Sequence, residues 1–467
     1  MIDTLSIRNS ILRLGFSGKL TSQQNTDEKV SDMLSRINPK KDIVQTENTP
    51  YEIPQTWSWV KLSDLYSINP KVEAAESDEA AFIPMEKICP GFTDNFTYEV
   101  QSWAKASKNH TKFRDEDVAF AKISPCFENR KSFIARNLPN GIGGGTTELI
   151  ILRQPEMLPE YTYYLVLDQR FINTGAASYK GTVGQQRVQS DVIKNYLVPV
   201  PPFSEQKRII NIVSEAFSIL DAIDELQNQY ASNQEALKSK LIDAAIQGKL
   251  TEQLPEDGTA EELYQGIQKE KQTLIKAGMI KKDKALPDIS ENEIPFDIPA
   301  NWKWVRVNDI GSWSAGATPS RSNPSYYANG TIPWIKTGEL NDGVIADAEE
   351  YITETAFKEC SVRLNPVGSV LIAMYGATIG KVAILDIEAT TNQACCACIP
   401  IKIDNKYLFY FLKNNKRTFL AASHGGAQPN ISKDIITKSL MPLPPLAEQQ
   451  RIAKKIDDVL FAINMAD

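Results

Sequence analysis

The sequence reads VPVPPFSEQKRI at residues 198–209 and MPLPPLAEQQRI at residues 441–452. In both runs, alternating prolines and aliphatic residues lead into a polar segment, which begins at Ser204 in the first copy. A serine in that place is a favourable helix N-cap, and the glutamate that follows it suits the positive end of a helix. Each run therefore predicts a junction at which a strand ends and a long helix begins.

Two further runs also occur twice, and all the matches preserve the order of the chain. They are IPQTWSWV at 53–60 with IPANWKWV at 298–305, and SGKLT at 17–21 with QGKLT at 247–251. By the last match Met1 corresponds to Ala231, whereas the first pair of runs makes Asp467 correspond to Asp224. The chain thus begins about where its second copy breaks off, which indicates a circularly permuted repeat.

The helix after Pro202 is predicted to run to about Gln247, because Gly248 is a natural helix stop. Two interleaved rows with a seven-residue spacing run along it: Ile209, Ala216, Ile223, Tyr230, Leu237 and Ala244, and Val213, Leu220, Gln227, Gln234 and Leu241. Such rows predict a coiled-coil seam, here with a polar middle.

The same pattern continues at both ends of the chain, through Ile7, Ile11 and Leu14 and through Ile452, Ile456, Val459 and Ile463. We expect these two pieces to form a composite partner for the central helix, in an antiparallel pair about 65 Å long at about 1.5 Å per residue. Oligomerisation through the seam is the alternative that the pattern leaves open.

The fold class predicted is mixed α+β, with two repeated globular domains separated by a long antiparallel two-helix coiled-coil rod. Short apolar runs at 118–123, 148–152, 369–374 and 382–385 are read as strands. The predicted parts are an N-terminal helix at 1–21, a first domain at 53–202, a central helix at 203–248, a linker at 249–297, a second domain at 298–445 and a C-terminal helix at 446–467.

The net charge of -7 argues against nucleic acid if it is taken as one number. Residues 53–202, however, hold 16 basic and 17 acidic residues, and residues 298–445 hold 14 and 12. The acidity therefore lies mainly in the connecting segments, and each domain can present a basic face. No stretch resembles a signal peptide or a membrane span, so we expect a soluble, cytoplasmic protein.

Motifs for catalysis and metal binding do not fit. The cysteines of the apolar run 394–401 are expected to be buried as small hydrophobic residues, so no metal site is predicted. The run 376–382 lacks the spacing of a P-loop, and the glycines of 142–146 are read as a tight turn between strands. Val200 and Leu443 precede the Pro-Pro pairs, where an adenine methyltransferase would carry Asn or Asp.

Polar, basic and aromatic side chains around glycine turns are instead suited to base edges, since amides read adenine and arginine or lysine reads guanine. The candidates in the first domain are Lys122, Ser124, Asn129, Arg130, Lys131, Tyr179, Lys180, Thr182, Gln185, Gln186 and Arg187. Those in the second domain are Thr318, Ser320, Arg321, Lys336, Tyr375, Lys381, Gln428 and Asn430. Trp57, Trp59, Trp302 and Trp304 are expected in the core.

The chain closely resembles the specificity subunits of Type I restriction-modification systems over nearly its whole length. The resemblance rests on PLPPLAEQQRI at 442–452, AQPNI at 427–431, GKLT at 248–251 and IPWIKTG at 332–338. It implies two target-recognition domains, each reading one half of a bipartite double-stranded DNA site, with the spacer set by the helices.

The resemblance also implies partner subunits. Two adenine-N6 methyltransferase subunits would bind S-adenosylmethionine, and optional restriction subunits would use ATP and Mg²⁺, so this chain would hold no cofactor and catalyse no reaction. An alternative of another class is a coiled-coil scaffold with two protein- or ligand-binding domains, which would explain the acidic balance without DNA.

Overall fold

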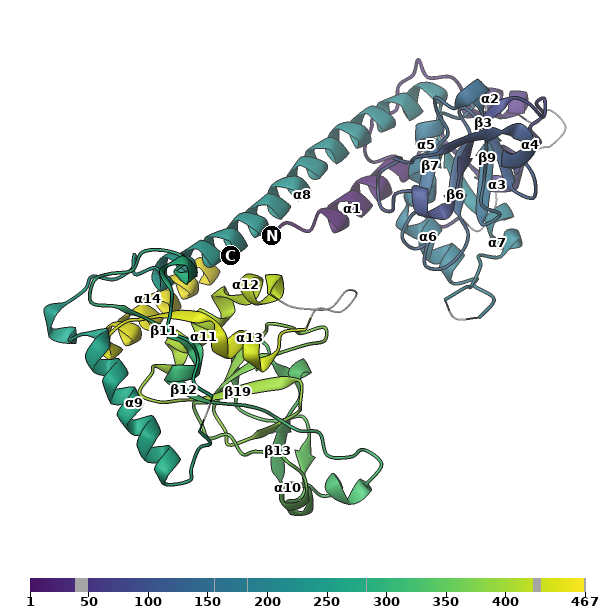
Figure 1. Cartoon of the computed structure of the whole chain (residues 1–467). Helices are drawn as coiled ribbons and strands as arrows, with labels where there is room; N and C mark the ends of the chain where they lie inside the picture. Colours follow the sequence, from purple (N-terminus) through teal and green to yellow (C-terminus); the bar gives the residue numbers. More distant parts are fainter. Residues whose placement is uncertain (38–48, 155, 183, 283, 423–429, 466–467) are drawn as a thin grey trace. The chain divides into compact units, whose positions relative to one another are not determined.

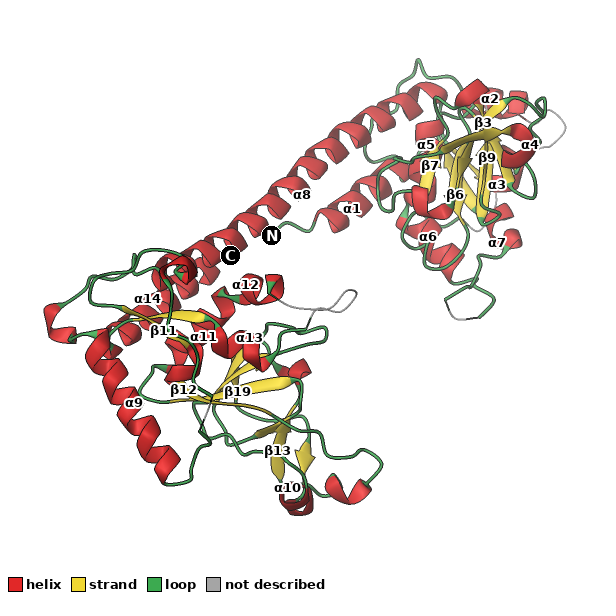
Figure 2. Cartoon of the chain, viewed as in Figure 1, coloured by secondary structure: helices red, strands yellow, loops and turns green. Residues whose placement is uncertain are grey.

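The chain folds into two units, Met1–Asn228 and Gln229–Asp467, in a computed structural model that describes residues 1–37, 49–154, 156–182, 184–282, 284–422 and 430–465. Both units mix helices with short strands (Figure 2). Among the described residues, none of the helices combines the length and the apolar character needed to cross a membrane.

The strands of unit 1 form three sheets. A two-stranded antiparallel sheet pairs β1 (Ser58–Lys61) with β10 (Leu197–Val200). The second sheet has the order β2 (Ser67–Ile68), β9 (Leu149–Arg153), β6 (Val118–Ala121) and β7 (Ser132–Ile134). The third has the order β4 (Glu99–Ser102), β3 (Glu79–Ile83), β8 (Ile142–Gly145) and β5 (Thr111–Arg114). The helices are α1 (Thr4–Phe16), α2 (Val30–Ile37), α3 (Leu62–Leu65), α4 (Trp103–Ala106), α5 (Pro159–Leu167), α6 (Gln169–Ala176), α7 (Ser190–Lys194) and the first part of α8 (Phe203–Ile246).

The inner strands β9 and β6 of the β2-β9-β6-β7 sheet are buried on both faces, which explains why they are almost wholly apolar. One face, with Ala119 and Phe133, packs against Phe113 of the β4-β3-β8-β5 sheet. The other face, with Phe120, packs against α5 and α6 (Figure 1). Unit 1 is therefore layered as sheet, sheet and helices.

The glycine run at 142–146 is not the predicted turn, because β8 is an inner strand paired with both β3 and β5. A Cβ on Gly144 would lie 1.8 Å from the carbonyl oxygen of Ala106 in α4, and one on Gly143 would lie 2.3 Å from the ring of Phe113. The glycines are required because a helix and an aromatic ring approach this strand closely.

Unit 2 repeats the plan. Strand β11 (Lys303–Arg306) pairs with β20 (Leu440–Leu443), and a five-stranded sheet has the order β12 (Gly311–Ala315), β19 (Cys395–Pro400), β16 (Val370–Ala373), β17 (Val382–Leu385) and β14 (Gly343–Ile345). A small sheet joins β15 (Tyr351–Ile352), β13 (Ile332–Ile335) and β18 (Thr390–Thr391). The helices besides the end of α8 are α9 (Ala260–Lys276), α10 (Glu354–Glu359), α11 (Asn405–Asn414), α12 (Lys416–Ala421), α13 (Lys433–Lys438) and α14 (Leu446–Met465).

Helix α8 has 44 residues, of which residues 203–228 belong to unit 1 and 229–246 to unit 2. In unit 1 it is antiparallel to α1, since Thr4 bonds Asp224 at 2.6 Å and Arg8 pairs with Asp221 at 2.8 Å. In unit 2 its last turns share a core with α14, through residues that include Ile452.

The predicted seam of α8 is buried only near the two ends of the helix. Ile209, Val213 and Leu220 are buried, whereas Tyr230 and Leu237 are 47% and 53% exposed. Near the C-terminal end the buried residues are Ile242, Ala245 and Ile246, one or two positions past the predicted Leu241 and Ala244, which are half-buried. Because Tyr230 and Leu237 lie in the middle of the predicted seam, the seam is not continuously buried within the described residues.

Candidate nucleic-acid interface

The helix start in unit 1 is built around a buried carboxylate. Glu205 is fully buried, and its side chain accepts hydrogen bonds from the indole of Trp57 at 2.8 Å, the hydroxyl of Thr21 at 2.8 Å and the amide of Gln23 at 2.9 Å. A buried carboxylate is tolerated only when donors replace its hydration shell. These contacts tie the segment after α1 and the start of the domain to the first turn of α8.

Unit 2 repeats this carboxylate site with the same donor types. Glu448 is fully buried and accepts from the indole of Trp302 at 2.8 Å, the hydroxyl of Thr251 at 3.0 Å and the amide of Gln253 at 2.9 Å. The three repeated runs of the sequence therefore meet in space. They form a structural joint in each unit rather than a reactive centre.

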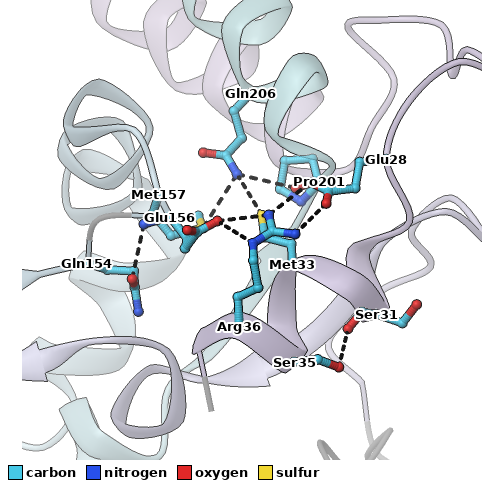
Figure 3. Close-up of polar contacts among 10 residues, drawn as sticks. All are labelled: Glu28, Ser31, Met33, Ser35, Arg36, Gln154, Glu156, Met157, Pro201 and Gln206. Atoms are coloured by element: carbon cyan, nitrogen blue, oxygen red, sulfur yellow. Dashed lines mark hydrogen bonds and ion pairs between the residues drawn. The ribbon is translucent and has the colours of Figure 1, made fainter. Parts of the chain in front are cut away.

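The residue after each buried glutamate is a buried glutamine that joins the helix to the domain. Gln206 accepts from the backbone N–H of Leu158 at 3.0 Å. Its amide nitrogen donates to the carbonyl of Pro201 at 3.3 Å and toward the sulfur of Met157 at 3.5 Å (Figure 3). Nearby, Arg36 of α2 pairs with Glu156 at 2.9 Å (Figure 3). In unit 2 Gln449 accepts from the N–H of Asp404 at 3.0 Å.

The glycine of each GKLT run packs closely against a proline of the same joint. Gly18 and Gly248 have φ of 66° and 73°, and a Cβ on either would lie about 2.5 Å from Pro54 or Pro299. Trp57, Trp59 and Trp302 are buried and Trp304 is half-buried, which confirms the expectation that these tryptophans serve the core.

The first candidate group of unit 1 lies in the connection from β6 to β7, and two of its basic residues are held internally. The Arg130 guanidinium donates to the carbonyl of Leu167 at 2.9 Å and to the side chain of Gln169 at 2.6 Å, and it lies 4.8 Å above the ring of Phe92. Lys131 donates to the carbonyl of Met85 at 2.8 Å. Arg130 and Lys131 therefore hold this connection in place. The other candidates of the group, Lys122, Ser124 and Asn129, lie in the same connection.

The second candidate group is a hairpin between α6 and α7. Lys180 and Arg187 exchange backbone hydrogen bonds of 2.9 and 3.2 Å, and the tip carries the exposed residues Thr182 and Gln185. The N–H of Ser124 donates to the carbonyl of Gln186 at 2.8 Å. The structure therefore brings the two groups of unit 1 together on one surface. At the base of the hairpin, half-buried Tyr179 packs edge-on against Phe127.

An acidic residue that the sequence reading missed anchors the hairpin. The Glu148 side chain accepts from the Arg187 guanidinium at 2.7 Å, and this contact lowers the pKa of the Glu148 carboxyl and raises the pKa of Arg187. The arginine side chain remains 46% exposed. Arg187 is thus oriented at the surface, with Nε and Nη2 donating to Glu148 and Nη1 donating to the carbonyl of Gln185 at 3.2 Å.

Unit 2 repeats this pairing of a candidate arginine with a glutamate. Arg321 forms a two-pronged ion pair with Glu350 and lies 4.3 Å above the ring of Tyr327. Glu350 also lies 3.5 Å from Lys336, so one carboxylate orients two candidates. Thr318 donates to Gln393, and Ser320 bonds the hydroxyl of Ser322 at 2.8 Å.

The remaining candidates of unit 2 gather at the ends of β16 and β17. The N–H of Ile431 donates to the carbonyl of Met374 at 2.8 Å, which places exposed Asn430 beside half-buried Tyr375. Lys381 is half-buried at the start of β17. Gln428 lies outside the described residues.

The three neighbouring cysteines, Cys395, Cys396 and Cys398, are fully buried in β19, as the sequence predicted. Burial raises the pKa of the Cys396 thiol to about 12, so this sulfur is a poor metal ligand or nucleophile. Within the described ranges, the structure has no cluster of three or more His, Cys, Asp or Glu side chains suited to a metal ion.

The family model described as the Type I restriction modification DNA specificity domain matches residues 54–230 and again residues 299–465. The chain belongs to this family. Each matched region contains the strands, the buried glutamate with its tryptophan partner and the polar loops of one unit. The chain is accordingly a DNA specificity subunit of the Type I restriction-modification class, and its relatives are named specificity subunits rather than the enzymes of those systems.

Two relatives from Escherichia coli match almost end to end. The Type I restriction enzyme EcoEI specificity subunit is 29% identical over 97% of this chain and 88% of its own length, and the EcoAI specificity subunit is 28% identical over 98% and 89%. A chain in a structure of complex assembly and conformational transition of the type I R-M system is 19% identical and has a TM-score of 0.63, covering 89% of this chain and 93% of that chain. This last likeness supports the mixed fold with two repeated domains.

Proposed function

We propose that each unit reads one half of a bipartite, asymmetric DNA sequence. The observation that supports this most strongly is one scaffold used twice with unlike polar loops. Both units have the same buried joint, yet Arg187 at the base of the unit 1 hairpin corresponds to Asn430 in unit 2. Arginine favours guanine and asparagine favours adenine, so the two half-sites should differ.

The base-reading surface of unit 1 is proposed to combine the hairpin 180–187 with Lys122, Ser124 and Asn129. That of unit 2 is proposed to combine Arg321 and Lys336 with Tyr375, Lys381, Gln428 and Asn430. In both units a glutamate fixes the orientation of an arginine whose side chain is about half exposed, and two-pronged guanine contacts need an arginine of fixed orientation.

Helix α8 is proposed to set the spacer between the half-sites, with α1 and α14 as a composite antiparallel partner. The contacts of Arg8 with Asp221 and of Ile452 with the last turns of α8 support an antiparallel arrangement in each unit. A helix can set the distance between two DNA-reading units because its length is fixed at about 1.5 Å per residue.

The chain is proposed to act in the cytoplasm with two adenine-N6 methyltransferase subunits and, where present, ATP-driven restriction subunits. S-adenosylmethionine, ATP and Mg²⁺ would be bound by those partners. In this division of labour the present chain positions the DNA, and the partners carry out methylation and cleavage.

The test is a genome-wide map of N6-methyladenine in cells that express this chain with its methyltransferase, compared with cells that lack only this chain. We expect a two-part motif with a fixed spacer that disappears on deletion. An unchanged map with both proteins expressed would reject the proposed function.

A further inference from the structure

We propose that Lys413, Lys416 and Arg417 of unit 2 form a binding site for a phosphate group of the DNA backbone. The inference rests on the proposed function of DNA reading and adds an anchoring site to it. These residues do not fit the pattern of amides and basic residues beside glycine turns that predicts the candidate base readers. Contacts to phosphates carry no sequence information but fix the register of a protein on its duplex.

The three cations converge on one cavity. Lys413 lies in the last turn of α11, and Lys416 and Arg417 open α12 directly after it. Together with Lys238 they line a cavity of about 410 Å³. The amide nitrogen of Asn414, which lines the same cavity, donates to the Asp243 carboxylate at 3.3 Å and has a second hydrogen that can be donated to an anion.

The charge of this cavity is positive and incompletely compensated. Its four cations face two carboxylates, and both carboxylates have other partners: Glu235 pairs with Lys238 at 3.1 Å, and Asp342 accepts from the N–H of Val382 at 3.0 Å. Over the ranges that the structure describes, Lys413, Lys416 and Arg417 form no ion pair within 4.0 Å. Converging cations without acidic partners favour an anionic ligand.

The backbone nearby is shaped to hold Lys416. Gly380 has a φ of 74°, and a Cβ at this position would lie 2.7 Å from Cγ of Lys416. The stem of Lys416 therefore packs directly on the Gly380 backbone. In unit 1 the corresponding residue is Arg130, which also has a positive φ, of 55°, and whose guanidinium donates to the carbonyl of Leu167 at 2.9 Å.

The comparison between units shows that the scaffold does not need these charges. Tyr161 and Tyr407 bond equivalent proline carbonyls, and this register matches Lys413, Lys416 and Arg417 with Leu167, Arg170 and Phe171. Leu167 and Phe171 are fully buried, and Arg170 is bonded to the carbonyl of Leu197 at 2.6 Å. Unit 1 thus uses these positions for packing, whereas unit 2 presents cations around a cavity.

The location of the site favours DNA over a free anion. Helix α12 ends at Ala421, and the candidate base-reading residues Gln428 and Asn430 follow within the next nine positions. Residues that read base edges are normally flanked by contacts to the adjoining phosphates. A phosphate anchor at α12 would hold the duplex while the following segment reads the bases.

The experiment measures the affinity of the full chain for a duplex carrying its methylated motif as a function of salt concentration. The test variant is Lys413→Gln/Lys416→Gln/Arg417→Gln, and a matched control, Lys269→Gln/Lys276→Gln/Lys282→Gln, removes three exposed lysines on and after α9. A charge-retaining variant, Lys413→Arg/Lys416→Arg/Arg417→Lys, separates charge from folding.

We expect the test variant to bind roughly 10-fold or more weakly at low salt, with a slope of log affinity against log salt that is shallower by about 2 to 3. The weakening should be similar on a scrambled duplex, and the charge-retaining variant and the α9 control should keep the wild-type slope. An unchanged slope in the test variant overturns the site. This holds also if the test variant keeps the wild-type slope but no longer binds its methyltransferase subunits, since the three cations would then serve assembly. If the wild-type chain binds the duplex with the motif and the scrambled duplex with equal affinity, the proposed function itself has failed.

Discussion

At the scale of single residues, the buried glutamates at the starts of α8 and α14 are the most constrained groups of the joint. Each carboxylate replaces its hydration shell with an indole, a hydroxyl and an amide donor. Removing one partner leaves the others buried and unpaired, at a cost of about 1 to 3 kcal/mol for each group. The joint therefore depends on all its members at once.

Glu205→Ala is expected to lower the thermal unfolding midpoint of unit 1 by roughly 5 to 10 °C, because the Trp57 indole and the Thr21 hydroxyl lose their hydrogen-bond acceptor. Calorimetry of the full chain measures this shift. Glu215→Ala, at an exposed position of the same helix, is the matched control and should change the midpoint little. Equal midpoints for the two variants would contradict the role given to the buried carboxylate.

A second residue-scale prediction concerns pH. The Arg208 guanidinium lowers the pKa of Asp27 to about 2, from an ordinary value of 3.8. Because the pKa is lower in the folded state, the pair stabilises the fold above about pH 4, and this contribution is lost as the pH falls toward 2. Asp27→Asn should be less stable than wild type at pH 7, with a difference that shrinks below pH 4.

Chemical denaturation of both proteins between pH 7 and pH 3 checks this pH dependence. A destabilisation by Asp27→Asn that stayed constant down to pH 3, or that grew as the pH fell, would show that the ion pair is not its cause. The equivalent pair of unit 2, Asp257 with Arg451, also lowers the pKa of its carboxyl and should follow the same direction.

At the scale of secondary-structure elements, strand β8 shows where a local pattern misleads. Three successive glycines look like a turn, yet they form an inner strand because α4 and Phe113 leave no room for side chains. Gly144→Ala is expected to lower the unit 1 midpoint by roughly 5 to 10 °C through overpacking. Gly266→Ala, in the open interior of α9, should instead leave stability unchanged or raise it slightly. Calorimetry that ranked the two variants in the opposite order would contradict this account.

The length of α8 leads to a second prediction at this scale. Inserting one heptad after Tyr230, where the helix is exposed, adds about 10 Å of helix. Because seven residues make about two turns, the parts of α8 before and after the insertion keep nearly the same rotation about the helix axis. If α8 sets the spacer, the methylated motif should keep both half-sites but gain a spacer longer by up to about 3 base pairs. Sequencing-based methylation mapping measures the spacer directly. A methylated motif with its original spacer would show that another element determines the distance.

At the scale of the whole molecule, repetition was the most informative property of the sequence. The runs at 198–209 and 441–452 predicted both helix starts, and the predicted central helix at 203–248 differs by two residues from α8 at Phe203–Ile246. Each of the four predicted strands also overlaps a strand of the structure. Local sequence patterns suffice for these features because caps, prolines and apolar runs act over a few residues.

The candidate interface could be predicted only in part, because long-range contacts decide which polar residues face solvent. Arg130 is a residue type that reads bases, yet its guanidinium donates to the carbonyl of Leu167, which is distant in the sequence. Glu148 was missed because nothing near it in the sequence reveals its pairing with Arg187. The candidates between Tyr179 and Arg187, in contrast, were chosen from the amides and basic residues beside glycine turns, and their contact with DNA stays a prediction.

The central claim is that each unit reads its own half-site. The most direct measurement is a methylation map for two matched variants of the full chain, Lys180→Ala/Arg187→Ala in unit 1 and Arg321→Ala/Asn430→Ala in unit 2. We expect each variant to relax or change one half of the motif and to leave the other half and the spacer intact. Variants that altered both halves together, or that left both halves unchanged, would contradict the claim.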